Sequence, residues 1–104
     1  MTVTDRPAEA AKGADAIYTD VFVSMGQEAE AEARRVAFEG FAVSTELMDQ
    51  AEAHAIFLHC LPAIRGEEVD ADVIDGGHSA VFEQAANRLA AARGALWWLM
   101  ERSS

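Results

Sequence analysis

A short apolar run that ends at a proline constrains this chain more than any other feature. The run Ala55 to Leu58 is rich in residues that suit a buried strand, and His59 and Cys60 follow it directly. Pro62 has no N–H to give to a sheet, so the strand must end before it. In open parallel α/β sheets, ligands bind in the crevice beyond the carboxyl ends of the strands. We therefore expect the loop after this strand to line a binding site.

Strand patterns alternate with helix patterns along the chain, which is typical of a parallel α/β sheet. Strands are expected at 16–19 and 55–59, with a brief edge strand at 2–4. Helices are expected at 7–12, 27–39, 46–53, 70–74 and 81–101. The last of them should have one apolar face, because helical spacing is followed by Val81, Ala85, Leu89, Ala92, Leu96 and Leu99. Their expected caps are Ser24, Thr45 and Asp70. We predict one α/β domain over residues 1–104, with a mostly parallel sheet and helices on both faces.

Bulk properties exclude several classes of protein. The chain has 104 residues, of which 51% are hydrophobic and 25% charged, which is typical of one small globular domain. A net charge of −10 argues against nucleic acid or an anionic membrane as partner. The single cysteine excludes an internal disulfide and fits a reducing compartment. Because neither a secretory signal nor a bilayer-length apolar run is visible, we expect a cytoplasmic location.

Residue chemistry alone leaves two interpretations of Cys60. A buried structural cysteine is the commoner case at the end of an apolar strand. A nucleophile needs a nearby base, and His59 is a poor partner because successive strand residues point to opposite faces. The same geometry weakens a metal site, and His54 and His78 have no ligand spacing with this pair, so no metal is expected. An unrelated cysteine-dependent hydrolase stays a weak alternative.

Three polar residues elsewhere also have both structural and functional interpretations. Asp20 follows an expected strand, where a carboxylate can hold an ammonium group, although a solvated loop aspartate is more common. Ser24 fits a helix N-cap and, equally, an ordered binding edge. Arg88 lies on the long last helix, where an arginine is usually solvated or ion-paired. No role is assigned to the charged loop residues Arg65, Glu67 and Glu68.

Three motifs give the chain a resemblance to a known family. Residues 58–69, Leu-His-Cys-Leu-Pro-Ala-Ile-Arg-Gly-Glu-Glu-Val, resemble the signature of ornithine carbamoyltransferases. Residues 18–28, Tyr-Thr-Asp-Val-Phe-Val-Ser-Met-Gly-Gln-Glu, are similar to the ornithine-loop motif of that family, and Ala-Asn-Arg-Leu at 86–89 resembles its last phosphate-side motif. The motifs occur in the family's order. No stretch resembles the family's N-terminal Ser-x-Arg-Thr-Arg carbamoyl-phosphate loop.

This resemblance implies a fold and a reaction. The fold would be part of the C-terminal ornithine-binding domain, which is Rossmann-like and three-layered, without the carbamoyl-phosphate-binding domain. The reaction would be transfer of a carbamoyl group from carbamoyl phosphate to ornithine, giving citrulline and phosphate in arginine biosynthesis. No metal or organic cofactor is implied. We expect the isolated chain to be inactive without an N-terminal half. Two alternatives stay open for that half: a separate chain supplies it, or the sequence is a fragment of a longer protein. Family members are usually homo-oligomers.

The resemblance also assigns site residues. The family's ornithine contacts match Asp20, Ser24 and Met25. Cys60 and Arg88 match the residues that face the reacting groups, and the cysteine is not a covalent nucleophile in the family. The carbamoyl-phosphate side of the cleft matches Cys60, Leu61 and Arg88.

The sequence departs from the family's motifs at two positions. Ile64 stands where a histidine is usual, and Ala86 stands where a glutamate is usual. The lost imidazole and the lost carboxylate put full activity in doubt. By resemblance, the front of this domain with its Gly-Asp-x-x-Asn strand is also missing, and that strand would lie in the centre of a doubly wound sheet. A second hypothesis therefore stays open, in which the chain is a non-catalytic truncated remnant or interaction domain of the same family. A carbamoyl-phosphate domain encoded next to this chain would distinguish the two.

Overall fold

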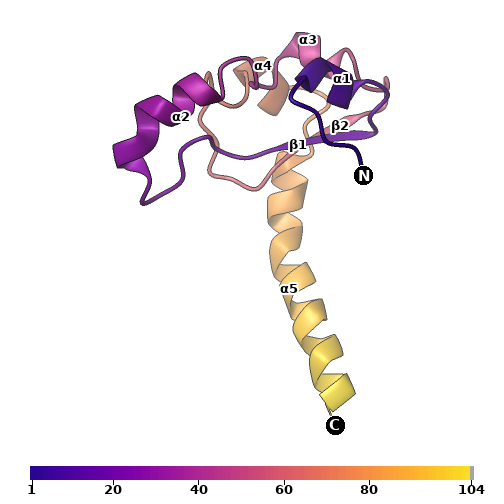
Figure 1. The fold of residues 1–104 in the computed structure, drawn as a ribbon. Helices are drawn as coiled ribbons and strands as arrows, with labels where there is room; N and C mark the ends of the chain where they lie inside the picture. The colour runs from indigo at the N-terminus through magenta and orange to yellow at the C-terminus, as the bar shows by residue number, and fades with distance from the viewer. Residues whose placement is uncertain (104) are drawn as a thin grey trace.

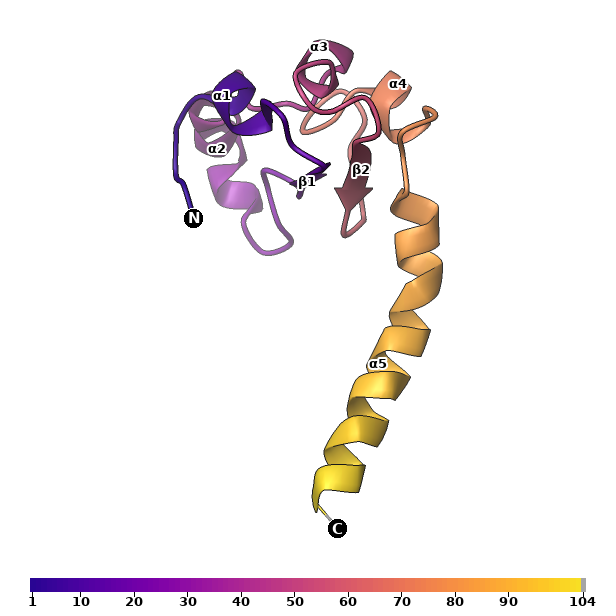
Figure 2. The same ribbon diagram turned by 90° about the vertical axis from the view of Figure 1, so that its right-hand side faces the viewer.

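The computed structural model describes residues 1–103, and its centre is a pair of parallel strands (Figures 1 and 2). Strand β1 (Ala16–Thr19) pairs with β2 (Ile56–His59) along its whole length. Beyond β2, Phe57 forms a further parallel bridge with Ser79, so a third extended segment lies on that side. The predicted α/β class with parallel strands is confirmed.

Helices connect and flank the strands. They are α1 (Pro7–Ala11), the 3-10 turn η1 (Glu28–Glu30), α2 (Ala31–Ala37), α3 (Thr45–Met48), α4 (Ala71–Ile74) and α5 (Val81–Ser103). In Figure 1, α1, α3 and α4 lie above the two strands, and α5 runs away below them. The starts of α4 and α5 agree with the sequence prediction, and the predicted helix over 27–39 is present as η1 followed by α2.

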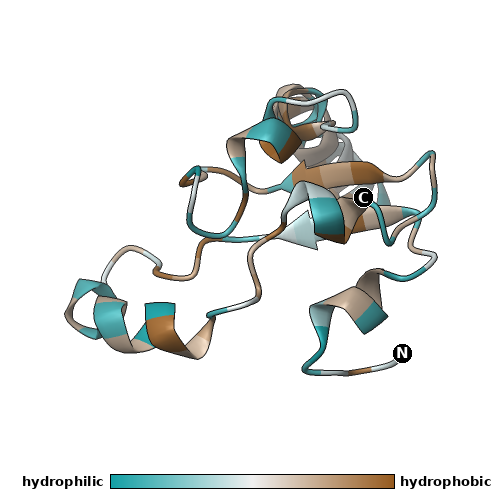
Figure 3. Cartoon of the chain, turned by 90° about the horizontal axis from the view of Figure 1, so that it is seen from above, coloured by the Kyte–Doolittle hydropathy of each residue, from teal (hydrophilic) through white to brown (hydrophobic). Residues whose placement is uncertain are grey.

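The core is small and sits between β2 and the short helices. It consists of Val43, Phe57, Val69, Val73, Ile74 and Val81. Along β2 the side chains alternate, because successive strand residues point to opposite faces: Phe57 and His59 are buried, and Ile56 is exposed. Figure 3 shows hydrophobic colouring along the strands, in keeping with this position of the core.

Two expectations for the N-terminal part are wrong. Residues 2–4 form no strand, because the Thr4 hydroxyl accepts a hydrogen bond from the Arg6 N–H at 3.2 Å and turns the chain into α1. Ser24 is not a helix cap, since η1 begins after Gln27. One half of the expected capping box is nevertheless formed, because the Ser24 N–H donates to Gln27 Oε1 at 3.3 Å.

Helix α3 is shorter than predicted and has a different cap. Ser44, not Thr45, is the N-cap, and its hydroxyl accepts a hydrogen bond from the Leu47 N–H at 3.1 Å. The helix does not continue toward residue 53, because the chain turns back to the loop before β1. There the Glu52 N–H donates to the carbonyl of Ala14 at 3.0 Å. A long-range backbone contact therefore sets the end of this helix.

Helix α5 projects from the body of the protein (Figure 2). Its predicted apolar side exists, but beyond Val81 it is exposed, and Leu89 and Leu96 are 69% and 62% accessible. The radius of gyration is 16.2 Å, whereas a compact domain of this length has about 13 Å. Among residues 1–103, no helix combines the length and apolarity that a membrane crossing requires.

The edge of β1 that faces away from β2 has no partner strand among the described residues. In a parallel pair, alternate residues direct their N–H and C=O groups to opposite sides, so half of the β1 backbone groups point away from β2. Unpaired strand edges template association with other chains. Trp97 and Trp98, which are 66% and 51% exposed, add apolar surface on α5.

We therefore predict that the isolated chain self-associates or is only marginally stable. Sedimentation analysis over a range of concentrations, combined with a urea melt, measures both properties. The core of six buried residues is too small to predict a large free energy of unfolding. A monodisperse monomer that unfolds in one sharp transition, with a free energy above about 5 kcal/mol, would contradict this prediction.

Candidate functional site

A cavity lies at the carboxyl ends of β1 and β2, where the first turns of α5 approach them. Its volume is about 510 Å³. It brings together Cys60, Leu61 and Arg88, three of the residues that the sequence singled out. The polar side chains of Tyr18 and Gln84 also line it. This is the place where ligands bind in open parallel sheets, so we take it as the candidate site.

The thiol of Cys60 lies beside the carboxylate of Asp20, which directly follows β1. The hydrogen bond from this thiol, followed by the backbone N–H of Val21 at 2.7 Å, lowers the pKa of Asp20. Cys60 is exposed, so it is not the buried structural cysteine that is common at strand ends. Partial desolvation of its thiol, followed by the hydrogen bond to Asp20, raises the pKa of the Cys60 thiol. The cysteine is therefore protonated and the aspartate ionised near neutral pH. A protonated thiol is a weak nucleophile, which counts against a cysteine-dependent hydrolase.

A buried pair, His59 and Glu68, supports the loop that carries Cys60. Both side chains are fully buried, and His59 Nε2 lies 2.8 Å from Glu68 Oε1. The Leu61 N–H donates to His59 Nδ1 at 2.8 Å, so the ring hydrogen sits on Nε2 and is donated to the carboxylate. The same Glu68 oxygen also accepts the Ile64 N–H at 2.8 Å. The pair thus holds both ends of the segment 61–64, in which Leu61 has a φ of 57°.

Sequence patterns assigned no role to the three charged loop residues Arg65, Glu67 and Glu68. In the structure, each of these three charged residues has a partner. Glu68 is buried against His59, Arg65 donates two hydrogen bonds to the Asp75 carboxylate at 2.8 and 2.7 Å, and Glu67 pairs with Arg35 at 3.1 Å. The burial of His59 could have been predicted from the sequence, because its position two residues after Phe57 places it on the same inward face of the strand.

The residues matched to ornithine contacts do not gather at one place, because Asp20 is separated from Ser24 and Met25. Asp20 stands at the end of β1 beside Cys60. Ser24 and Met25 lie on the exposed loop before η1, and Met25 is 95% accessible. Neither of these two lines the cavity at the strand ends. The structure therefore brings Cys60, Leu61 and Arg88 into one cavity. It places Asp20 beside Cys60 but outside the lining of that cavity, and Ser24 and Met25 do not join them.

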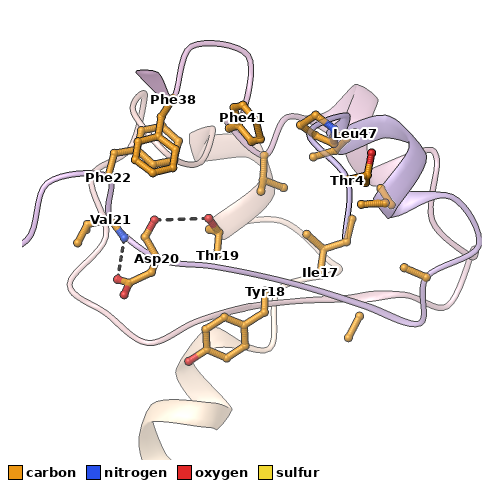
Figure 4. Close-up of a pocket in the computed structure, with 16 residues that line it drawn as sticks. Thr4, Ile17, Tyr18, Thr19, Asp20, Val21, Phe22, Phe38, Phe41 and Leu47 are labelled. Carbon is orange, nitrogen blue, oxygen red and sulfur yellow. Dashed lines mark hydrogen bonds between the residues drawn. The ribbon is translucent and has the colours of Figure 1, made fainter. Parts of the chain in front are cut away.

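A second cavity, of about 580 Å³, lies along β1 (Figure 4). It is lined mainly by apolar side chains, among them Ile17 and the stacked rings of Phe22 and Phe38, whose centroids are 4.8 Å apart. Asp20 is its one charged residue. Apolar walls suit further polypeptide better than a polar substrate. We therefore place the chemistry in the smaller cavity.

No group of three or more His, Cys, Asp or Glu side chains within residues 1–103 is arranged to hold a metal ion. The polar side chains at the strand ends are one carboxylate, one thiol, one phenol, one imidazole, one guanidinium and the two amides of Gln84 and Asn87. They can pair with ionic groups of opposite charge and donate hydrogen bonds. Such a set suits binding and orientation of small charged molecules.

Comparison with known proteins gives a consistent result. The family model for the Asp/Orn-binding domain of aspartate/ornithine carbamoyltransferase matches residues 1–99. The chain is 56% identical over 100 residues to the ornithine carbamoyltransferase of Methanothermobacter thermautotrophicus, covering 96% of this chain and 33% of that protein. It is 59% identical over 98 residues to the enzyme of Symbiobacterium thermophilum, covering 94% of this chain and 31% of that protein.

Solved structures agree with the sequence relatives. The ornithine carbamoyltransferase of Pyrococcus furiosus superposes with a TM-score of 0.79 at 55% identity, covering 88% of this chain and 29% of that one. The anabolic enzyme of Campylobacter jejuni gives a TM-score of 0.86 at 41% identity, covering 92% and 32%. The chain spans about a third of the length of the curated relatives it matches. Because the family model matches residues 1–99, the chain belongs to the aspartate/ornithine carbamoyltransferase family and corresponds to part of its ornithine-binding domain.

Proposed function

We propose that this chain supplies the ornithine-binding part of an ornithine carbamoyltransferase. The observation that carries the proposal is the cavity at the strand ends, where Cys60, Leu61 and Arg88 meet beside Asp20. The relatives that bear this name, including the anabolic enzyme of Campylobacter jejuni, support a role in arginine biosynthesis. The substrates would be ornithine and carbamoyl phosphate, with no cofactor.

In this reaction the neutral δ-amine of ornithine attacks the carbonyl carbon of carbamoyl phosphate. The new C–N bond forms as the C–O bond to phosphate breaks, phosphate leaves with the electron pair, and the nitrogen loses a proton. The chain's part is to hold charged groups in place, which removes much of the entropic barrier. The ionised Asp20 would pair with the substrate ammonium, and the guanidinium of Arg88 would pair with the phosphate. Cys60 and Leu61 would line the space around the reacting atoms.

The alternative, a non-catalytic remnant or interaction domain, also has specific support. Ile64 and Ala86 put apolar side chains where the family's motifs have a histidine and a glutamate. Ser24 and Met25 lie outside the cavity that holds Arg88. A remnant would keep the fold and lose turnover, so a complementation experiment separates the two proposals.

We predict that the chain alone makes no citrulline and that a complementary half restores turnover. Arg88 is the one cation that lines the cavity, and one guanidinium is too little to bind a phosphate and to polarise a carbonyl. The test is a citrulline assay on the purified chain, alone and co-expressed with the part of the Methanothermobacter enzyme that it does not cover, in a host without its own enzyme.

The complementary part alone is the control. Turnover by the isolated chain above the level without enzyme would refute the prediction of inactivity. A folded complex of the two parts that makes no citrulline would favour the remnant. Turnover that appears only in the complex would support the proposed function.

A further inference from the structure

The side chain of Gln84, on the first turn of α5, reaches both strands. The backbone N–H of His59 donates to Gln84 Oε1 at 3.0 Å. On its other side, Gln84 Nε2 donates to the hydroxyl oxygen of Tyr18 at 3.3 Å. A backbone N–H can only donate, so the oxygen of the amide must face His59 and its NH₂ group must face Tyr18. The orientation of this amide is therefore determined by the end of β2.

The phenol of Tyr18 links the Gln84 amide to the Cys60 thiol. Because its oxygen accepts the Gln84 N–H, its own hydrogen remains available for another acceptor. Tyr18 makes a side-chain hydrogen bond with Cys60, and both residues line the same cavity as Gln84. Figure 4 shows the ring of Tyr18 turned toward α5 and away from the apolar cavity along β1.

The same amide places the cationic group of the site. Arg88 is four residues after Gln84 on α5, so the two side chains lie on one face of the helix. Within α5, Val81 is the buried residue and the rest of the helix projects from the body. The helix therefore depends on its first turn for its orientation, and the two hydrogen bonds of Gln84 act there.

We propose that Gln84 and Tyr18 are positioning residues, which together hold the Cys60 thiol and the Arg88 guanidinium in one arrangement at the strand ends. The inference rests on the proposed function only in treating Cys60 and Arg88 as site residues. The ionisable groups that act on the thiol are Asp20, which follows β1, and Tyr18 on β1. Arg88 lines the same cavity from α5, and His59 lines it at the end of β2 while its buried ring pairs with Glu68. Gln84 is neutral, so its replacement by another neutral residue changes the geometry without changing this set of charges.

The thiol gives a direct test, because Cys60 is the chain's only cysteine. The hydrogen bond from Tyr18 lowers the pKa of the thiol, opposing burial and Asp20, which raise it. Losing that bond must therefore raise the pKa further and slow alkylation at a fixed pH below it. We expect alkylation by iodoacetamide at pH 8 to become about two- to tenfold slower in both Tyr18→Phe and Gln84→Met, the change that one ordinary hydrogen bond gives.

The experiment compares the pH dependence of alkylation in the whole chain, in both single variants and in the double variant. If the two residues act through one bond, the double variant should be no slower than Tyr18→Phe. Gln50→Met, on an exposed glutamine outside the cavity, is the matched control and should leave the profile unchanged. Tyr18→Phe removes one oxygen from a half-exposed ring, so it keeps the test valid if Gln84→Met fails to fold.

Unchanged profiles in folded Tyr18→Phe and Gln84→Met would overturn the proposal. Effects that multiply in the double variant would also overturn it, because they would show that the two side chains act separately. The readout is thiol ionisation in the isolated chain. It therefore does not depend on whether a complemented enzyme makes citrulline, and the proposed function can fail while this inference stands.

Discussion

Replacing Glu68 with alanine is expected to lower the free energy of unfolding by about 3–5 kcal/mol, the cost of breaking a buried pair by removing one partner. The carboxylate oxygen accepts hydrogen bonds from His59 Nε2–H and from the Ile64 N–H, both at 2.8 Å. The variant leaves both donors without this acceptor in a site from which water is excluded. Because each 1.4 kcal/mol is tenfold, the folding equilibrium should shift by roughly a hundredfold to a few thousandfold.

Urea melts followed by far-UV circular dichroism measure the global effect. Hydrogen exchange at the amides of Leu61 and Ile64 measures the local effect and remains informative if the chain self-associates. Glu67→Ala is the matched control, since it removes the neighbouring carboxylate from a partly exposed pair with Arg35. Such pairs are worth about 1 kcal/mol or less. Equal losses of unfolding free energy in Glu67→Ala and Glu68→Ala would contradict the prediction, because the buried His59–Glu68 pair would then stabilise the fold no more than a partly exposed pair.

The sequence predicted the two paired strands well, unlike the strand expected at 2–4, because local and tertiary preferences agree there. The strand at 16–19 has its predicted limits, and the one predicted at 55–59 is observed as Ile56–His59, which ends before Pro62 as expected. A proline and an alternating apolar pattern act within a few residues, so their effects can be read locally. The start of α5 at Val81 could be predicted for the same reason, because its signal also lies within a few residues.

Features that depend on distant residues could not be predicted. The end of α3 is set by a backbone hydrogen bond from Glu52 to Ala14 across 38 positions of sequence. The burial of Glu68 depends on His59, nine residues away on a strand, and a loop glutamate is ordinarily solvated. Helical spacing correctly predicted an apolar side of α5, but whether that side is covered depends on packing partners, and here it is exposed.

In the candidate site, too, some residues could be predicted from local sequence and others could not. Strand ends and motif positions predicted Cys60, Leu61 and Arg88, which the structure brings into one cavity. The amide of Gln84 was overlooked, because a glutamine on a helix has no distinctive pattern. Its position four residues before Arg88 was the available signal. The assignment of Ser24 and Met25 to ornithine stays a prediction, since their loop lies outside that cavity.

In a complemented enzyme, Asp20→Asn is expected to raise the KM for ornithine, and Arg88→Ala to raise the KM for carbamoyl phosphate. Each change removes one charge-assisted hydrogen bond, worth about 1.5–3 kcal/mol, so each KM should rise roughly tenfold to a hundredfold. The Asp20 carboxylate is ionised and therefore suited to an ammonium group, whereas a guanidinium suits a phosphate. Steady-state kinetics with each substrate varied separately measure the two effects.

Matched controls come from the same elements of the fold. Arg93→Ala removes a guanidinium from α5 that does not line the site cavity, and Asp49→Asn removes an exposed carboxylate at the end of α3. Both should leave both KM values unchanged. The decisive feature is the crossed pattern, because general damage to the fold would raise both values together. If Asp20→Asn leaves the ornithine KM unchanged and Arg88→Ala leaves the carbamoyl phosphate KM unchanged, the proposed residue roles are wrong even if the complemented enzyme makes citrulline.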